Sequence, residues 1–173
     1  MRDFSGGLPL AVSPVTLRMR FNPNATGPEP EPAPGELPPQ VDLRQMSLFG
    51  AGWTAGSLKY LAEEDLQSLT YYETTGWRGV METEAGSPLP EKFQSLPGAV
   101  FPLYHVLADL GEFAGGRIIP TESSDILQIE GLALQKGSHI RVLLANLSGE
   151  PRTVTVKNLR DQVSVRQMDE KNV

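Results

Sequence analysis

The stretch LTYYETTGWRGVME, residues 69–82, places a short strand-like run directly before a segment of charged and aromatic residues. Residues 66–72 (LQSLTYY) end in aromatic residues and predict a β-strand. In a (β/α) barrel the functional groups lie where strands end and loops begin. The residues at this position are Glu73, Thr74, Thr75, Trp77 and Arg78. The stretch therefore predicts a ligand-binding loop at the end of a barrel strand.

A second strand and two helices surround this loop in the sequence. Residues 8–17 (LPLAVSPVTL) predict a short buried strand. Residues 46–64 and 99–113 carry apolar residues at helical spacing, after the first and the second strand respectively. Six prolines in residues 27–39 exclude a helix interior or a central strand there. The order of strand, loop and helix, repeated twice, is typical of two consecutive β-α units.

The last third of the chain changes to a period of two. Residues 126–134 alternate, residues 136–138 form a turn, and residues 140–146 form the returning strand. Two more short strands are expected at 153–156 and 163–165. We therefore expect a partial (β/α) barrel over residues 1–115 and an antiparallel, β-sandwich-like domain over residues 116–173.

The length of the chain conflicts with a complete barrel. A (β/α)8 barrel takes about 200 residues or more, whereas this chain has 173 residues and two predicted β-α units. We therefore expect the last two β-α units of a barrel, belonging to a longer enzyme or to a truncated gene product. The exposed strand edges of such a piece predict self-association. The alternative is a small, self-contained α+β domain.

The composition narrows the possible partners and chemistry. A net charge of −6, from 21 acidic and 15 basic residues, does not favour a nucleic-acid partner. The chain has no cysteine, which excludes disulfides, thiolate nucleophiles and cysteine-ligated zinc. The two histidines do not have metal-ligand spacing, so we expect neither a metal nor a cofactor. No signal peptide and no membrane-length apolar run is evident, which predicts a soluble, cytoplasmic protein without a membrane partner.

The candidate catalytic residue is Glu73, with Trp77 and Arg78 as substrate-binding residues beside it. A carboxylate and a guanidinium hold hydroxyl or carbonyl oxygens, and an indole offers a flat apolar face to a sugar ring. The alternative is structural: Glu73 pairs with Arg78, and Trp77 packs under the loop. Two further acids, Glu82 and Glu84, are expected to be solvated.

The end of the first strand supplies further candidates. If both strand ends open on one face, Arg18 and Arg20 lie opposite Glu73 and bind an anionic product or polarise a carbonyl. Alternatively, these arginines neutralise the proline-glutamate loop that follows. Asn22 and Tyr72 complete the predicted substrate-binding set.

Two other features have mainly structural interpretations. Residues 50–55 (GAGWTA) match the dinucleotide pattern G-x-G-x-x-G/A, but the preceding residues 38–45 are too polar for the required buried strand. His105 lies in an apolar helical pattern and is expected to be structural. His139 lies beside a turn and is expected to be exposed. Neither a G-x-S-x-G elbow nor a P-loop occurs.

Several long stretches resemble one protein family. They are LPLAVSPVTLRMRFNPNATGPE, PPQVDLRQMSLFGAGWTAGSLKYLAE, LTYYETTGWRGVMETEAGSPLP, LPGAVFPLYHVLADLGEF and VLLANLSGEPRTVTV. Together, over residues 8–158, they resemble the C-terminal part of D-apionate lactonase. The resemblance implies a glycoside-hydrolase-like barrel with a β-rich C-terminal domain. It also implies hydrolysis of D-apionolactone to D-apionate in bacterial catabolism of apiose.

The resemblance places the two predicted strands last in the barrel. Related barrel glycosidases usually hold a nucleophilic carboxylate at the end of the penultimate strand, where this chain has residues 13–16 (SPVT) and no acid. A retaining double-carboxylate mechanism therefore cannot be assembled. A lactone needs a general base, for which Glu73 is suited, and an oxyanion partner such as Arg18 or Arg78. We expect further residues on other strands and an inactive isolated chain. The alternative is a non-catalytic carbohydrate-binding or interaction module.

Overall fold

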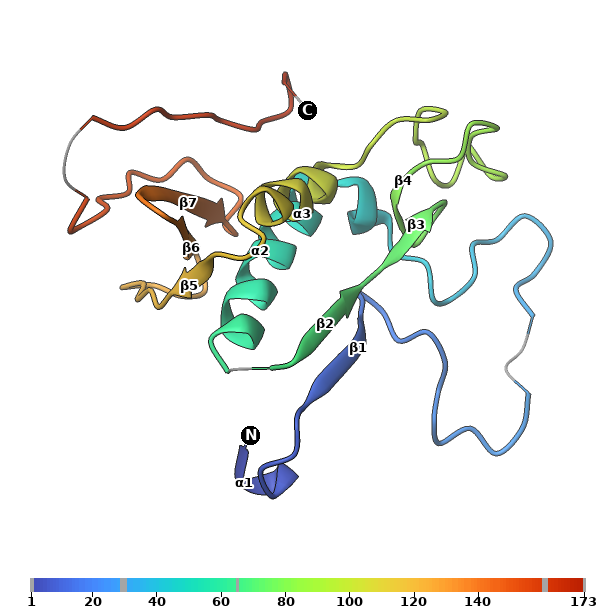
Figure 1. Cartoon of the computed structure of the whole chain (residues 1–173). Helices are drawn as coiled ribbons and strands as arrows, with labels where there is room; N and C mark the ends of the chain where they lie inside the picture. The colour runs from blue at the N-terminus through green and yellow to red at the C-terminus, as the bar shows by residue number, and fades with distance from the viewer. Residues whose placement is uncertain (1, 29–30, 65, 160–161, 173) are drawn as a thin grey trace.

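The computed structural model describes residues 2–28, 31–64, 66–159 and 162–172. Two helices lie in the middle, with β1 to β4 on one side and the sheet of β5 to β7 on the other (Figure 1). The elements in chain order are α1 (Arg2–Ser5), β1 (Ala11–Val15), η1 (Leu43–Met46), α2 (Leu48–Ala62), β2 (Ser68–Tyr71), β3 (Glu73–Thr75), β4 (Gly79–Met81), α3 (Pro102–Glu112), β5 (Arg117–Ile119), β6 (Ile129–Lys136) and β7 (His139–Asn146).

The first two strands form the parallel pair that the sequence predicts. Ala11 lies opposite Ser68, and Val12 lies opposite Leu69. Helix α2 connects the two strands, so β1, α2 and β2 make a β-α-β unit of the kind from which barrels are built. Within the described residues this sheet has two strands. The carboxyl ends of β1 and β2 therefore lie side by side, which brings the segments after them together.

Helix α2 is packed on two sides. Its N-terminus is capped by Ser47, whose hydroxyl accepts a hydrogen bond from the Gly50 amide at 3.2 Å. The helix contacts α3 and also β6 and β7. Small residues allow this approach: a Cβ added at Gly56 would contact the Glu130 side chain at 3.8 Å. Packing on both sides explains how a glycine-rich sequence remains helical.

The C-terminal sheet is antiparallel in the order β5-β6-β7. Strands β6 and β7 form the predicted hairpin, in which Lys136 pairs with His139 across a turn where Gly137 has a φ of 60°. This left-handed conformation favours glycine. The sequence did not predict β5, a strand of three residues that pairs with β6.

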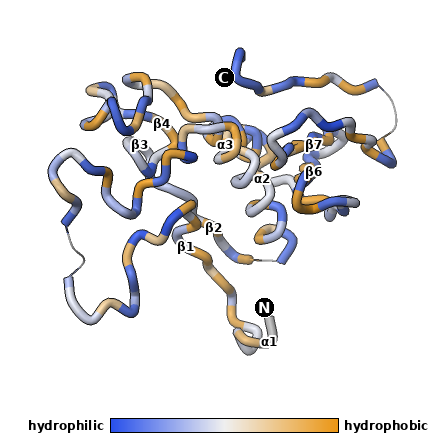
Figure 2. The backbone as a smooth tube through the Cα atoms, turned by 180° about the vertical axis from the view of Figure 1, so that it is seen from behind, coloured by the Kyte–Doolittle hydropathy of each residue, from blue (hydrophilic) through white to orange (hydrophobic). Residues whose placement is uncertain are grey.

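The two strands predicted at 153–156 and 163–165 are wrong. Neither segment forms a strand, and their valines are exposed. Figure 2 shows the C-terminal segment running past β7 with hydrophobic and hydrophilic stretches along it. An alternating sequence forms a strand only where a neighbour supplies hydrogen bonds and its apolar face is covered. The described residues supply neither.

The core joins both halves of the chain. Phe93 and Leu103 on one side, and Leu132 and Leu134 of β6 on the other, are buried in one cluster with residues of α2. Phe93 packs against Phe101 with ring centroids 5.9 Å apart. Helix α3 begins at Pro102, which suits the first turn of a helix because proline lacks an amide hydrogen. In the described part of the chain, no helix has the length and apolar character needed to cross a membrane.

Candidate functional site

The segment after β2 forms a tight turn between the strands β3 and β4. This segment, expected as a ligand-binding loop, contains the strands β3 and β4, which run parallel with Glu73 opposite Gly79. The Glu73 amide donates to the Arg78 carbonyl at 2.9 Å. The turn is so tight that a Cβ at Gly79 would lie 2.6 Å from the Thr75 carbonyl carbon. The backbone therefore holds Trp77 and Arg78 in a fixed position at its tip.

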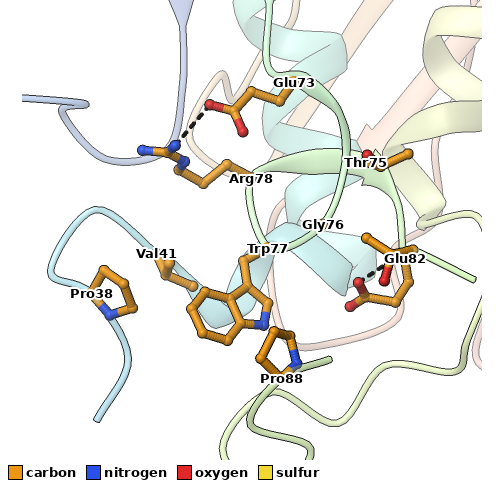
Figure 3. Close-up of a pocket in the computed structure, with 10 residues that line it drawn as sticks. Pro38, Val41, Glu73, Thr75, Gly76, Trp77, Arg78, Glu82 and Pro88 are labelled. Atoms are coloured by element: carbon orange, nitrogen blue, oxygen red, sulfur yellow. Dashed lines mark hydrogen bonds and ion pairs between the residues drawn. The ribbon is translucent and has the colours of Figure 1, made fainter. Parts of the chain in front are cut away.

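Glu73 pairs with two arginines that come from different segments. Arg20, from the segment after β1, donates a hydrogen bond to Glu73 Oε1, and Arg78 Nη2 lies 2.9 Å from the same oxygen. The three side chains are about one-third exposed, at 36%, 32% and 37% for Arg20, Glu73 and Arg78. Figure 3 shows the pair of Glu73 and Arg78 above the pocket. The strand ends thus meet, and Arg20 lies opposite Glu73. Glu73 also pairs with Arg78, as the structural alternative predicts.

Arg18 has different partners from those predicted. Its Nε donates to Asp42 Oδ2 at 3.3 Å, and its Nη1 donates to the Pro39 carbonyl at 3.1 Å. Neither partner is Glu73, so Arg18 does not lie where the sequence predicts. It contacts the end of the proline-glutamate loop at Pro39, but the acid it pairs with is Asp42, which follows that loop.

Asp42 is the centre of a second charged group next to this loop. It caps η1 by accepting the Arg44 amide at 2.9 Å, and the Arg44 Nη2 lies 2.7 Å from its other oxygen. Hydrogen bonds from Arg44 lower the pKa of Asp42 to about 2, although burial opposes the change. The ionised carboxylate thereby fixes the loop that carries Pro38 and Val41 to the pocket.

Four of the six predicted ligand contacts do not line the pocket: Arg18, Arg20, Asn22 and Tyr72. Tyr72 is buried in the core, where its hydroxyl shares a hydrogen bond of 2.7 Å with Thr54, and burial raises its pKa to about 12. Asn22 is exposed on the loop after β1, where its side chain accepts the Asn24 amide at 3.0 Å. Neither residue lines the pocket. Tyr72 has a φ of 49°, and the next residue, Glu73, is about one-third exposed.

Trp77 is both packed and accessible to the pocket. Its Nε1 donates to Ser87 Oγ at 2.9 Å, and its ring lies 6.5 Å from that of Phe93. It also lines a pocket of about 350 Å³. The other lining residues are Pro38, Val41, Glu73, Thr75, Gly76, Arg78, Glu82, Thr83 and Pro88 (Figure 3). Three predicted site residues, Glu73, Trp77 and Arg78, therefore share one pocket.

Glu82 is not the solvated acid that the sequence predicts. Its side chain is only 1% exposed, accepts the Thr83 amide at 2.8 Å and accepts a hydrogen bond from the Ser95 hydroxyl. It lines the same pocket as Glu73. Its place directly after a short strand is the signal that could have revealed it. Glu84 is exposed, as predicted.

The remaining motifs do not contribute to this site. Residues 50–55, with the dinucleotide pattern, lie inside α2 rather than before its first turn, so their amides are not available to a phosphate. His105 is exposed on α3, with its ring 5.6 Å from Tyr104, whereas a structural role was predicted. His139 is exposed, as predicted. Across the described ranges, no group of three or more His, Asp or Glu side chains is placed to hold a metal.

The β1-α2-β2 unit, with charged residues gathered after its parallel strands, is compatible with (β/α)-barrel proteins and with other parallel α/β folds. A family model described as D-apionate lactonase, TIM barrel domain, matches residues 1–115. The chain belongs to this family, as the resemblance predicted. No curated protein and no solved structure matches the chain. The sheet from β5 to β7 lies outside the matched residues.

Proposed function

We propose that this chain forms part of the ligand site of a D-apionate lactonase and that its pocket holds D-apionolactone. The main support is the meeting of Arg20 and Arg78 at Glu73, beside Trp77. Charged donors and an acceptor next to a flat aromatic ring suit a small hydroxylated ring. A pocket of about 350 Å³ falls in the usual range for small-molecule sites.

Lactone hydrolysis requires three things: a nucleophilic water, a base and a donor for the oxyanion. Both guanidiniums contact Oε1 of Glu73, and the described residues place no hydrogen bond on Oε2. We assign Oε2 the role of accepting the proton from water as it attacks the lactone carbonyl. Arg78 donates to the developing oxyanion. The ring carbon–oxygen bond then breaks, the ring oxygen takes the proton, and the hydroxy acid is released as D-apionate.

We propose that further strands complete the sheet that β1 and β2 begin. A closed barrel has eight strands, whereas β1 and β2 form a two-stranded sheet in the described residues. Apolar side chains near β1 are exposed, among them Leu8, Met19 and Phe21. Further β-α units would cover these residues and add groups to the site. We propose that the chain binds the lactone weakly by itself and turns it over only after the sheet is completed.

A cytoplasmic location is part of the same proposal, in keeping with a sequence that has no cysteine. The second candidate function is a carbohydrate-binding module without turnover. One observation favours it: both arginines neutralise Glu73, which suits a residue that holds a ligand without transferring a proton.

The first experiment is calorimetric titration of the chain with D-apionolactone. We expect saturable binding that Glu73→Gln weakens about tenfold, because the charge-assisted hydrogen bonds of the two arginines are lost. The matched control is Glu91→Gln, which changes an exposed glutamate that makes no ion pair in the described residues. A wild-type chain that binds neither the lactone nor D-apionate would refute the proposal.

A complementation assay separates the enzyme from the binding module. The chain is mixed with a polypeptide that carries the preceding β-α units of a D-apionate lactonase, and acid release is followed by pH-stat. If turnover appears on mixing and is lost in Glu73→Gln, Glu73 is catalytic. Lactone binding by the mixture without any turnover would support the binding module.

A further inference from the structure

The pocket contains a second carboxylate whose surroundings differ from those of Glu73. Glu82 is 1% exposed, and its two oxygens accept hydrogen bonds from neutral donors, the Thr83 amide and the Ser95 hydroxyl. Among the described residues, Glu82 forms no ion pair, whereas Glu73 is paired with two guanidiniums. A carboxylate buried without a cation is uncommon in proteins outside functional sites. Glu82 therefore requires an explanation other than charge neutralisation.

The charges give the pocket two unlike sides. Glu73 and Arg78 line one side, and Arg20, which does not line the pocket itself, pairs with the same oxygen of Glu73. The two arginines carry one more positive charge than Glu73 can neutralise, so this side has a surplus of positive charge. Glu82 adds a second carboxyl group to the lining of the pocket, and it has no cationic partner among the described residues. Figure 3 shows the pair of Glu73 and Arg78 above Trp77 and Glu82 to the right of Trp77. A ligand lying against Trp77 thus meets a donor-rich side and an acceptor-rich side.

The hydrogen-bonding capacity of Glu82 is only partly used. Each carboxyl oxygen can accept more than one hydrogen bond, and the described residues supply one donor to each oxygen of Glu82. A ligand hydroxyl is a suitable further donor, because it has a hydrogen to offer to these oxygens. A carbonyl oxygen of the ligand has no hydrogen to donate to Glu82, whereas Arg78 can donate to it.

We propose that Glu82 determines specificity by accepting hydroxyl groups of the ligand while the carbonyl end of the ligand faces Arg78. The site is then selective for a polyhydroxylated lactone over an unsubstituted one, and it binds the lactone in one orientation. This inference rests on the proposed function, since it concerns the same pocket. Glu82 then defines the side of the pocket that binds hydroxyl groups, and Arg78 defines the side that binds the carbonyl group.

The test uses NMR titration of the wild-type chain with D-apionolactone and with γ-butyrolactone, a lactone without hydroxyl groups. The Thr83 amide reports on Glu82, because it donates to Glu82 Oε1. The Arg78 Nε–H reports on the opposite side. We expect D-apionolactone to shift both signals and γ-butyrolactone to shift only that of Arg78.

The other outcomes of the titration contradict either the role of Glu82 or the proposed function. If D-apionolactone shifts Arg78 but leaves Thr83 unchanged, or if both lactones shift Thr83 equally, the role of Glu82 is wrong and the proposed function stands. If neither lactone shifts either signal, the proposed function fails, and the inference fails with it.

A pair of variants distinguishes ligand contact from a structural role. Glu82→Gln should weaken binding of D-apionolactone about tenfold, with less than about a twofold effect on γ-butyrolactone. Glu84→Gln, which changes an exposed acid two positions along the same loop, should affect neither. An equal loss for both lactones would mean that Glu82 only supports the loop, and would overturn the inference. If Glu82→Gln does not fold, the wild-type titration decides.

Discussion

Replacing Asp42 by Asn tests the charged group that anchors the loop beside the pocket. Asp42 is 6% exposed and accepts hydrogen bonds from both Arg18 and Arg44. Asparagine keeps the shape and one acceptor oxygen for the cap of η1, but it removes the charge. We therefore expect Asp42→Asn to fold and to lose the electrostatic part of the stabilisation.

The size of the effect follows from the pKa of Asp42, which Arg44 lowers from 3.8 to about 2 in the folded chain. At 1.36 kcal/mol per pKa unit, this difference corresponds to about 2.4 kcal/mol of stability. Because the folded pKa is the lower one, the contribution is fully present above pH 3.8 and is lost as the pH falls through about 2. At pH 3, where Asp42 is ionised in most folded chains but in few unfolded ones, its contribution to stability is about 1.3 kcal/mol.

The assay is urea denaturation of the wild type and of Asp42→Asn at pH 5.5 and pH 3. The difference in free energy of unfolding between the two proteins should fall from about 2.4 to about 1.3 kcal/mol. Taking the difference cancels the titration of the other acids. The control is Glu36→Gln, because Glu36 forms an exposed pair with Lys92 at 3.1 Å, and such pairs contribute about 0–1 kcal/mol. A difference that is the same at both pH values would refute the reasoning.

Two further perturbations test the turn and the strand edges. Gly79→Ala should open the turn and weaken lactone binding, because the new Cβ would lie 2.6 Å from the Thr75 carbonyl carbon. The matched control is Gly111→Ala, where the new Cβ would have no atom within 4 Å. Unchanged lactone affinity in Gly79→Ala would contradict the geometry of the turn. The chain should also sediment as species heavier than its 18.8 kDa monomer, and Val12→Lys on β1 should reduce this association. A wild-type chain that remains monomeric at about 100 μM would rule out association through the strand edges.

Local periodicity predicted most of the regular elements. The parallel strands, both long helices and the hairpin of β6 and β7 all lie largely within the predicted segments. The expected burial of the first strand is wrong, because β1 has no buried residue. The same reasoning failed at residues 153–156, because a strand also needs a partner, and a partner is not a local property. It also missed β3 and β4, whose pairing depends on one tight turn at Gly79.

The candidate site was predicted in part for a similar reason. Glu73, Trp77 and Arg78 are close in sequence, so the end of one strand was enough to group them. Arg18 and Arg20 are alike in sequence, and only the course of the loop decides that Arg20 reaches Glu73 while Arg18 reaches Asp42. Glu82 was missed because its burial depends on contacts across a long loop, where its amide donates to the Ala99 carbonyl at 2.8 Å.

The packing of α2 on two sides determines how the chain should unfold. One side of the helix contacts α3, and the other contacts β6 and β7, where the buried Lys59 lies 3.8 Å from the buried Glu130. Removal of the sheet would therefore expose apolar helix surface and leave Lys59 without Glu130. The barrel-type unit and the C-terminal sheet share this helix as a common part of their cores. They should consequently lose structure together, in one cooperative transition, although the family match ends at residue 115.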